Sequence, residues 1–169
     1  FGLNVGIADS ALKVQLTPLD PIFAYRRFKV NADNFVSIDK SNHIKADMNL
    51  LADDGTALNL YSTPNETAQQ DITLSIANFN LGELSRVLPF MPMVTGMLNG
   101  DIHAVKEEEQ ATVSVDMDVK KMGFEGSPLG DIGMEMIYFP NADGSHLVDG
   151  ILSQNNREIA LLNGRYWTK

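Results

Sequence analysis

Apolar and polar residues alternate along most of this chain, in one short segment after another. The alternation is clearest over residues 72–76, 113–119 and 132–136. Successive side chains of a β-strand point to opposite faces of a sheet, so each segment is predicted to be a strand with one apolar and one polar face. The pattern therefore predicts an all-β protein with a long apolar surface to cover.

The same pattern, broken by turn residues, divides the chain into a series of predicted strands. They cover residues 3–7, 12–17, 22–30, 35–39, 44–51, 56–62, 71–77, 97–105, 111–121, 129–139, 146–152 and 158–167. The links are too short for helical crossovers, so we predict an antiparallel meander of roughly ten to twelve strands. The strands at 111–121 and 129–139 each extend over about 35 Å, which favours a curved, groove-like, U-shaped sheet.

In one segment the apolar residues recur at helical spacing and not at every second position. Its apolar residues are Leu81, Leu84, Val87 and Leu88. Asn80 stands where a helix cap is expected, and Pro89 and Pro92 end any helix that begins there. We predict one short amphipathic helix near 81–88 whose apolar stripe plugs an end of the sheet or packs on its edge.

Length and composition fit one globular domain. The chain has 169 residues, of which 44% are hydrophobic and 21% charged, so we predict a single β-rich domain over 1–169. The helix separates its sub-parts, 1–79 and 89–169. The chain begins at Phe1, already within a strand-like pattern, without a signal peptide or an apolar run of about 18 residues. We expect it to be a piece of a larger repeat protein.

Net charge restricts the partners. The formal net charge of -9 argues against nucleic acid, because phosphate binding needs clustered Lys and Arg. It also argues against docking by charge on an anionic lipid surface, but it does not exclude acyl chains in an apolar groove. The chain has no cysteine, so no disulfide, thiolate zinc site or cysteine nucleophile is possible.

No set of residues points to catalysis or to a metal. The histidines are far apart and lack the spacing of a ligand pair: His43, His103 and His146. Asp116 and Asp118 share one strand face, but two solvent-facing acids are commoner than a glycosidase pair. The acidic run at 107–109 is typical of a solvated hairpin tip. We therefore expect no enzyme, no cofactor and no metal.

The apolar strand faces are the candidate binding surface. The predicted lipid-contact residues are Ile72, Leu74, Ile76, Val113, Val115, Met117, Val119, Ile132, Met134 and Met136. The chain has eight methionines, and methionine adapts to irregular apolar partners. If strands 111–121 and 129–139 pair, their valines and methionines form a broad apolar strip. Ordinary filling of a core accounts for the same residues.

Four short patterns give the chain a family resemblance. They are Ile-Ala-Asn-Phe-Asn-Leu-Gly-Glu-Leu at 76–84 with Val87-Leu88-Pro89, Thr-Gly-Met-Leu-Asn-Gly-Asp-Ile at 95–102, Phe-Glu-Gly-Ser-Pro-Leu-Gly-Asp-Ile at 124–132, and Asn-Gly-Arg-Tyr at 163–166. With them, the chain from about residue 75 to its end resembles the TamB family and its AsmA-like relatives, in the form found in Bacteroides-type bacteria. The resemblance implies a periplasmic, cell-envelope β-groove with an apolar lining. It also implies phospholipid transport or outer-membrane assembly, with an inner-membrane anchor in a segment absent here.

Three functions are consistent with these patterns. The first is an envelope segment that holds lipid acyl chains in a groove, with outer-membrane assembly proteins as further partners. The second is a structural or adhesive β-sandwich of the cell surface, whose apolar faces close against each other. The third is an enzyme acting on glycans. Alternation does not separate the first two, because a groove and a sandwich both need one apolar face for each strand.

Overall fold

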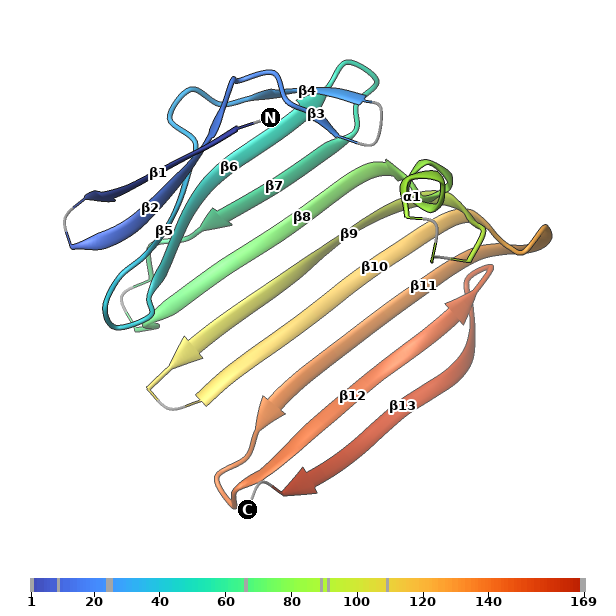
Figure 1. Ribbon diagram of the computed structural model, residues 1–169. Coiled ribbons are helices and arrows are strands. Elements are labelled where there is room, and N and C mark those ends of the chain that lie inside the picture. The colour runs from blue at the N-terminus through green and yellow to red at the C-terminus, as the bar shows by residue number, and fades with distance from the viewer. Residues whose placement is uncertain are drawn as a thin grey trace.

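The fold is a single open sheet that curls along its length. The computed structural model describes residues 2–8, 10–23, 26–65, 67–88, 90, 92–108 and 110–167. Thirteen antiparallel strands and one short helix make up this part of the chain (Figure 1). The prediction of an all-β, groove-like meander with one helix is confirmed.

The strands follow one another through the sheet almost in chain order. They are β1 (Gly2–Ala8), β2 (Ala11–Thr17), β3 (Ile22–Phe23), β4 (Arg26–Val30), β5 (Phe35–Ile38), β6 (Ile44–Ala52), β7 (Ala57–Ser62), β8 (Gln70–Asn80), β9 (Val94–Glu107), β10 (Gln110–Phe124), β11 (Ser127–Pro140), β12 (Ser145–Gln154) and β13 (Arg157–Trp167). The path runs β1-β2-β5-β6 and then in unbroken order to β13, while β4 pairs with β6 beside β5. Strands β1 and β13 each pair on one side only and are the two edges of the sheet.

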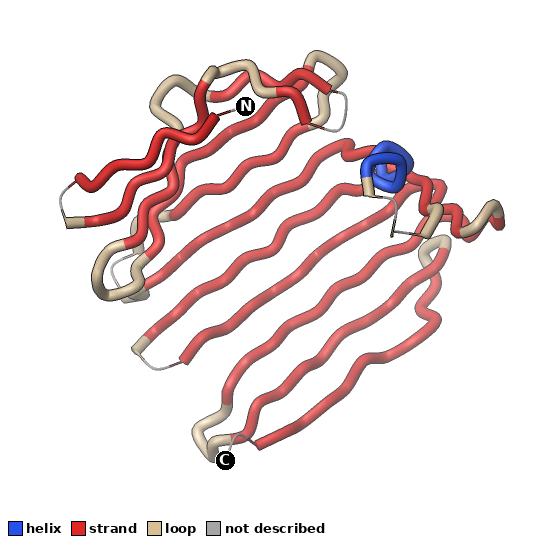
Figure 2. The backbone as a smooth tube through the Cα atoms, in the orientation of Figure 1, coloured by secondary structure: helices blue, strands red, loops and turns tan. Residues whose placement is uncertain are grey.

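The loops and the helix lie at two opposite ends of the strands (Figure 2). Helix α1 (Leu81–Val87) and the turns at 53–56, 125–126 and 155–156 mark one end, which we call the α1 end. The turns at 39–43 and 141–144, with the adjoining ends of β9 and β10 at Glu107 and Gln110, mark the other, which we call the far end. The N-terminal strands curl over toward the viewer of Figure 1, so the sheet is a trough whose axis follows the strands.

The prediction of one continuous strand over 22–30 is wrong. The structure has two strands there, and Ile22 of β3 pairs antiparallel with Arg27 of β4. The chain therefore reverses between them, and the connecting residues 24–25 lie outside the described part. Nothing in the local sequence signals this reversal, because no Gly, Pro, Asn or Asp stands between Ile22 and Val30.

Irregular pairing is concentrated at the α1 end. The register shifts between Ile76 and Phe79 in β8, between Lys120 and Gly123 in β10, and between Leu152 and Ser153 in β12. A bulge adds a residue to one strand, bends it and increases its twist. The long strands therefore bend at the end where the helix lies.

Two strand backbones come unusually close at Gly100 in β9. Gly100 has φ +147°, and a Cβ built on it lies 2.6 Å from Cα of Met117 in β10 and also meets the carbonyl oxygen of Asp116. Real Cβ atoms do not approach a backbone atom this closely. Only glycine allows β9 and β10 to pair at this position.

The substitution Gly100→Ala is expected to lower the free energy of unfolding by more than about 1 kcal/mol, because the new methyl group forces the two strands apart. Gly6→Ala in β1 is the matched control, since no atom lies within 4 Å of its built Cβ. Denaturant unfolding followed by circular dichroism measures both. Equal stability of the two variants contradicts the close approach.

Aspartates fix three of the hairpin turns. Asp39 accepts hydrogen bonds from the backbone N–H groups of His43 and Ser41, and those bonds lower the pKa of its carboxyl. The bond from the backbone N–H of Thr56 lowers the pKa of Asp54. For Asp143, the bond from the Ser145 hydroxyl, at 2.6 Å, has the same effect on the pKa. These turns are stabilised by carboxylates in the charged form.

Stability is expected to fall in acid. Since the folded-state pKa of these carboxyls is lowered, their contribution is complete above the ordinary aspartate value of about 4 and is lost as pH falls through the folded-state values. Thermal unfolding measured from pH 7 to pH 2 tests this. The variant Asp143→Asn should be less stable at pH 7 and less sensitive to acid, and an unchanged acid response in that variant would contradict the assignment.

Candidate functional site

A continuous apolar surface crosses the sheet on one side, and we call it the inner face. Residues directly opposite each other on paired strands share a face, so a row can be followed from strand to strand. One row consists of Met48, Leu60, Leu74, Ile102, Val115, Met136, Gly150 and Leu162. The next consists of Leu50, Leu58, Ile76, Gly100, Met117, Met134, Leu152 and Ala160.

The structure brings all ten predicted lipid-contact residues to the inner face. Six belong to the two rows above. Ile72 and Val113 lie in the neighbouring row on the far-end side, and Val119 pairs with Ile132 on the α1 side. The predicted pairing of the two long strands is also observed, with Val115 opposite Met136.

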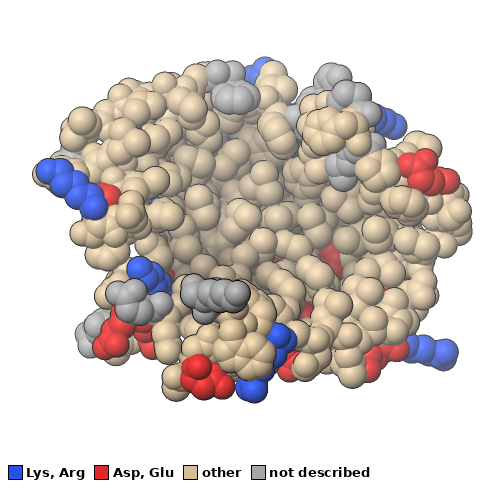
Figure 3. Space-filling model, turned by 60° about the horizontal axis from the view of Figure 1, so that its bottom comes forward, with Lys and Arg blue, Asp and Glu red and all other residues tan. Residues whose placement is uncertain are grey.

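The inner face is the wall of the trough. Figure 3 shows a hollow formed almost entirely by uncharged residues, with Lys, Arg, Asp and Glu mainly around its rim. Val115, at the centre, is 9% exposed, and the other nine predicted contact residues are half-buried. No second sheet covers this face in the described part of the chain. Large aliphatic side chains therefore meet the space inside the trough.

Acidic residues occupy the opposite, outer face. Asp101, Asp116 and Glu135 stand directly opposite one another on β9, β10 and β11. A shallow depression of about 340 Å³ on this face is bordered by Asp116, Glu135 and Asp149 and also by the exposed side chains of Ile137 and Ile151. Within the described ranges, no group of three or more His, Asp or Glu residues is placed to hold a metal ion.

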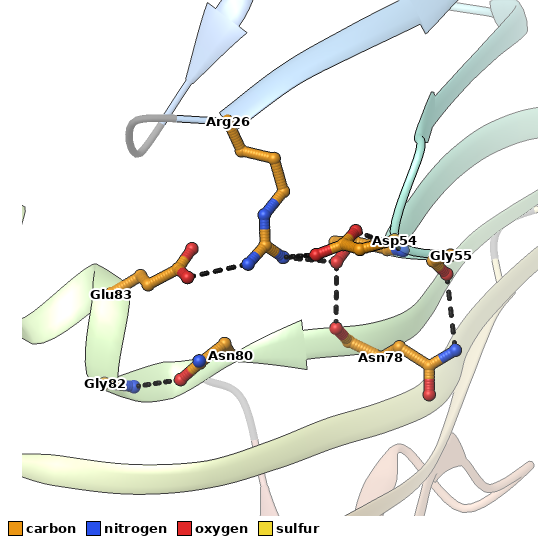
Figure 4. Close-up of polar contacts among 8 residues, drawn as sticks. Arg26, Asp54, Gly55, Asn78, Asn80, Gly82 and Glu83 are labelled. Carbon is orange, nitrogen blue, oxygen red and sulfur yellow. Dashed lines mark hydrogen bonds and ion pairs between the residues drawn. The ribbon is translucent and has the colours of Figure 1, made fainter.

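Four elements meet at the α1 end, and Arg26 of β4 joins them (Figure 4). Its guanidinium donates to Glu83 of α1 at 2.7 Å, pairs with Asp54 of the β6–β7 turn at 3.1 Å and also donates to the Thr56 hydroxyl. Thr56 in turn donates to the carbonyl oxygen of Asn78 in β8.

Three well-buried side chains lie at the same end of the sheet as this network. Phe28 of β4, Ala52 of β6 and Thr56 are each at most 4% exposed. Phe28 and Ala52 are directly opposite each other in the sheet. The α1 end therefore has a small packed cluster of its own.

Helix α1 follows the predicted pattern in part. The side chain of Asn80 accepts from the N–H of Gly82, as predicted for the cap, and the helix ends at Val87 with Leu88 as its C-cap. Leu81, Leu84 and Leu88 are half-buried, but Val87 is exposed and does not belong to a buried stripe. No helix of the described chain is both long and apolar enough to cross a membrane.

A polar aromatic cluster lies on the inner face at the far end. His146 of β12 stacks between Tyr138 of β11 and Tyr166 of β13, with ring centroids 5.9 and 5.0 Å apart. The Tyr138 hydroxyl and Nδ1 of His146 are 2.7 Å apart. A hydrogen bond with Tyr166 raises the pKa of Tyr138, so this phenol stays neutral.

Sequence reasoning did not find this cluster. The sequence shows His146 only as one of three widely spaced histidines, whereas the structure places it between two tyrosines. The signal that was available is the hairpin at 141–144, which sets Tyr138 and His146 on the same face of neighbouring strands. The other two histidines pair with carboxylates, His43 with Asp39 and His103 with Asp71.

The Arg26 contacts yield a stability test. Arg26→Ala is expected to lower the free energy of unfolding by about 1–3 kcal/mol, because Glu83 and Thr56 lose a partly buried partner. The adjacent Arg27→Ala is the matched control, since its ion pair with Asp20 is exposed and contributes less than about 1 kcal/mol. Chemical denaturation measures both, and equal losses would show that the network does not hold the α1 end together.

Comparisons with known proteins identify no relative of the chain. No protein-family model, no curated protein and no solved structure matches it. The resemblance of residues 76–84, 95–102, 124–132 and 163–166 to the TamB family therefore stays a prediction.

Proposed function

We propose that this chain is a non-catalytic, lipid-binding segment of a TamB/AsmA-like envelope protein, and that it holds phospholipid acyl chains on the inner face. One observation carries the proposal: the inner face is continuous across the sheet, apolar and uncovered among the described residues. Contiguous apolar surfaces of this kind mark sites of interaction. Acyl chains match it because they need apolar contact and no directional bond.

The dimensions of the trough suit an acyl chain. From Val113 to Val119 the inner face of β10 extends for six residue steps, roughly 20 Å at 3.3 Å each. One leaflet of a bilayer offers its acyl chains about 15 Å, half of the roughly 30 Å hydrocarbon thickness. Each methylene group removed from water contributes about 0.8 kcal/mol, so a dozen give a gross gain of about 10 kcal/mol. Binding then needs no specific hydrogen bond along the chain.

A closed, adhesive β-sandwich is the alternative. A sandwich buries its inner faces between two sheets about 10 Å apart. The described strands instead form one sheet whose edges, β1 and β13, do not meet. This arrangement favours the lipid proposal over the sandwich for this chain.

Location and partners follow from the family resemblance and belong to the same proposal. The protein is placed in the periplasm of a cell envelope, anchored to the inner membrane by a segment outside this sequence. Its task there is phospholipid transport or outer-membrane assembly, with outer-membrane assembly proteins as further partners. The net charge of -9 argues against a nucleic acid as ligand and leaves acyl chains in an apolar groove open.

Lipid retention tests the proposal directly. The purified chain, delipidated and then mixed with phospholipid vesicles, is expected to carry phospholipid that native mass spectrometry detects. Val115→Glu or Met134→Glu should abolish retention, because either change puts a charge on the apolar wall. Ser114→Glu is the matched control, since Ser114 is the neighbour of Val115 on the outer face of β10.

The outcomes separate the two functions. Retention that survives both inner-face substitutions, in variants whose circular dichroism is unchanged, shows that the inner face is not the lipid site. A wild-type chain that takes up no lipid and instead dimerises through the inner face supports the sandwich.

A further inference from the structure

An apolar patch lies on the outer face of the C-terminal strands, and we call it the outer patch. It consists of Ile137 of β11, Ile151 of β12 and Leu161 of β13, which are 40%, 40% and 65% exposed. Ile151 stands directly opposite Leu161, and Ile137 lies diagonally across the β11–β12 pair from Ile151. Both isoleucines border the shallow depression of the outer face. Contiguous exposed aliphatic side chains of this kind mark sites of interaction.

Acidic residues alternate with the outer patch. Glu135 is directly opposite Ile151, and Asp149 is directly opposite Ile137. Both acids border the same depression as the two isoleucines. From Glu135 the acids continue across the neighbouring strands, and we call the whole set the outer acids: Asp101, Asp116, Glu135 and Asp149. All four are exposed.

None of the outer acids forms an ion pair with a residue that the structure describes. Lys120 lies on the same face of β10, but it pairs with Asp118 and Asp131 at 3.7 Å each. Arg165 of β13 lies over the ring of Trp167, 6.0 Å from its centroid. Like charges directly opposite each other destabilise a sheet. Cationic groups from another molecule would therefore relieve a repulsion that the chain itself leaves in place.

The charge of this surface selects its partner. The outer acids repel a nucleic acid and an anionic lipid surface. A second copy of this chain brings a net charge of -9, which opposes association of the two. A small polyamine would meet the acids and leave the outer patch in water. The complementary partner combines cationic and aliphatic side chains, which is the chemistry of a basic amphipathic polypeptide.

The width of the outer patch suits one helix. The patch crosses three neighbouring strands, and two strand spacings of about 4.8 Å make roughly 10 Å. An α-helix with its side chains is about 10–12 Å across. Helices commonly cover the apolar face of a sheet in layered folds. Lys and Arg beside the apolar stripe of such a helix lay their methylene groups along the patch and extend their charged ends to the carboxylates.

We propose that the outer face of β10–β13 docks a basic amphipathic helix of a partner protein. The aliphatic stripe of the helix lies on the outer patch, and its Lys or Arg side chains pair with the outer acids. The inner face takes no part. This site is therefore independent of the proposed lipid site, and both faces can be occupied at once.

Binding of a synthetic helix tests the proposal. The probe is a fluorescein-labelled peptide of about 18 residues with Leu on one face and Lys on the other, which is long enough to form a helix. Fluorescence anisotropy with the full chain should show saturable binding that weakens as salt screens the ion pairs. Peptides with Glu in place of Lys, or Ser in place of Leu, should not bind. Absence of binding by the Leu/Lys peptide, or equal binding by the Leu/Glu peptide, overturns the proposal.

The placement of charge is tested at constant net charge. The test variant neutralises three outer acids: Asp116→Asn, Glu135→Gln and Asp149→Asn. The control neutralises three exposed acids of turns: Asp33→Asn, Asp53→Asn and Glu108→Gln. The test variant should bind the Leu/Lys peptide about tenfold more weakly, the combined effect expected of three exposed ion pairs, and the control should change binding much less. Equal losses would show that binding follows net charge alone and would overturn the site.

The apolar contact is tested on both faces of the sheet. Ile137→Ser combined with Ile151→Ser should weaken peptide binding about tenfold through lost apolar contact. Leu51→Ser changes an exposed leucine at an outer-face position of β6 and should have no effect. Met134→Ser, on the inner face, should also leave binding intact, and circular dichroism checks that each variant is folded. Binding lost in Met134→Ser but kept in the isoleucine variant places the peptide in the trough and overturns the proposal.

Stability of the free chain supplies a second readout. Asp116 is the middle one of three acids that stand directly opposite one another, so Asp116→Asn should raise the midpoint of chemical denaturation while it weakens peptide binding. A less stable Asp116→Asn variant overturns the role assigned to repulsion. The outcome is also separate from the lipid proposal. A chain that binds the peptide and retains no phospholipid keeps this site, whereas one that retains phospholipid and binds no peptide overturns it.

Discussion

The register of the antiparallel ladder is the constraint on which the rest of this structure depends. Opposite residues share a face, so every apolar row stays aligned only while each hairpin keeps its pairing. A slip of one residue in β10 would turn Val115 outward and bring Asp116 into the trough. Gly100 fixes this pairing sterically, because β9 and β10 approach too closely there for any other residue. The continuous inner face is a product of these registers and not of any covering layer.

The distribution of charge follows from the same registers. Asp101, Asp116 and Glu135 stand opposite one another on the outer face, an arrangement that costs stability through like-charge repulsion. It also keeps carboxylates out of the described inner face, where an acid would have to be desolvated. Among the described strands, a face without acids beside a face rich in them lets an acidic protein keep an apolar wall. Net charge alone does not reveal such a separation.

Much of the fold was predictable because the signals were local. Alternation located the strands and Asn80 marked the helix cap, each through the chemistry of neighbouring residues. The β3–β4 reversal was missed because nothing in its sequence signals a turn. The Arg26 network and the Tyr138–His146–Tyr166 cluster were missed for a different reason, since their members meet only after distant strands pair and bend. The ten predicted lining residues were placed correctly on one face, because that required only the period of the strand.

The two free edges give the molecule an open-ended architecture. Strands here pack chiefly against their immediate neighbours in the sheet, so stability accumulates strand by strand, as it does in repeat proteins. In such a one-dimensional array the outermost strands are held on one side only and separate first, while the long central strands β8 to β11 separate last.

The number of strands is also not fixed by closure of the sheet. Another hairpin paired with β13 widens the trough by about 10 Å without disturbing any existing contact. Width is thus a property that evolution can adjust by adding or removing hairpins.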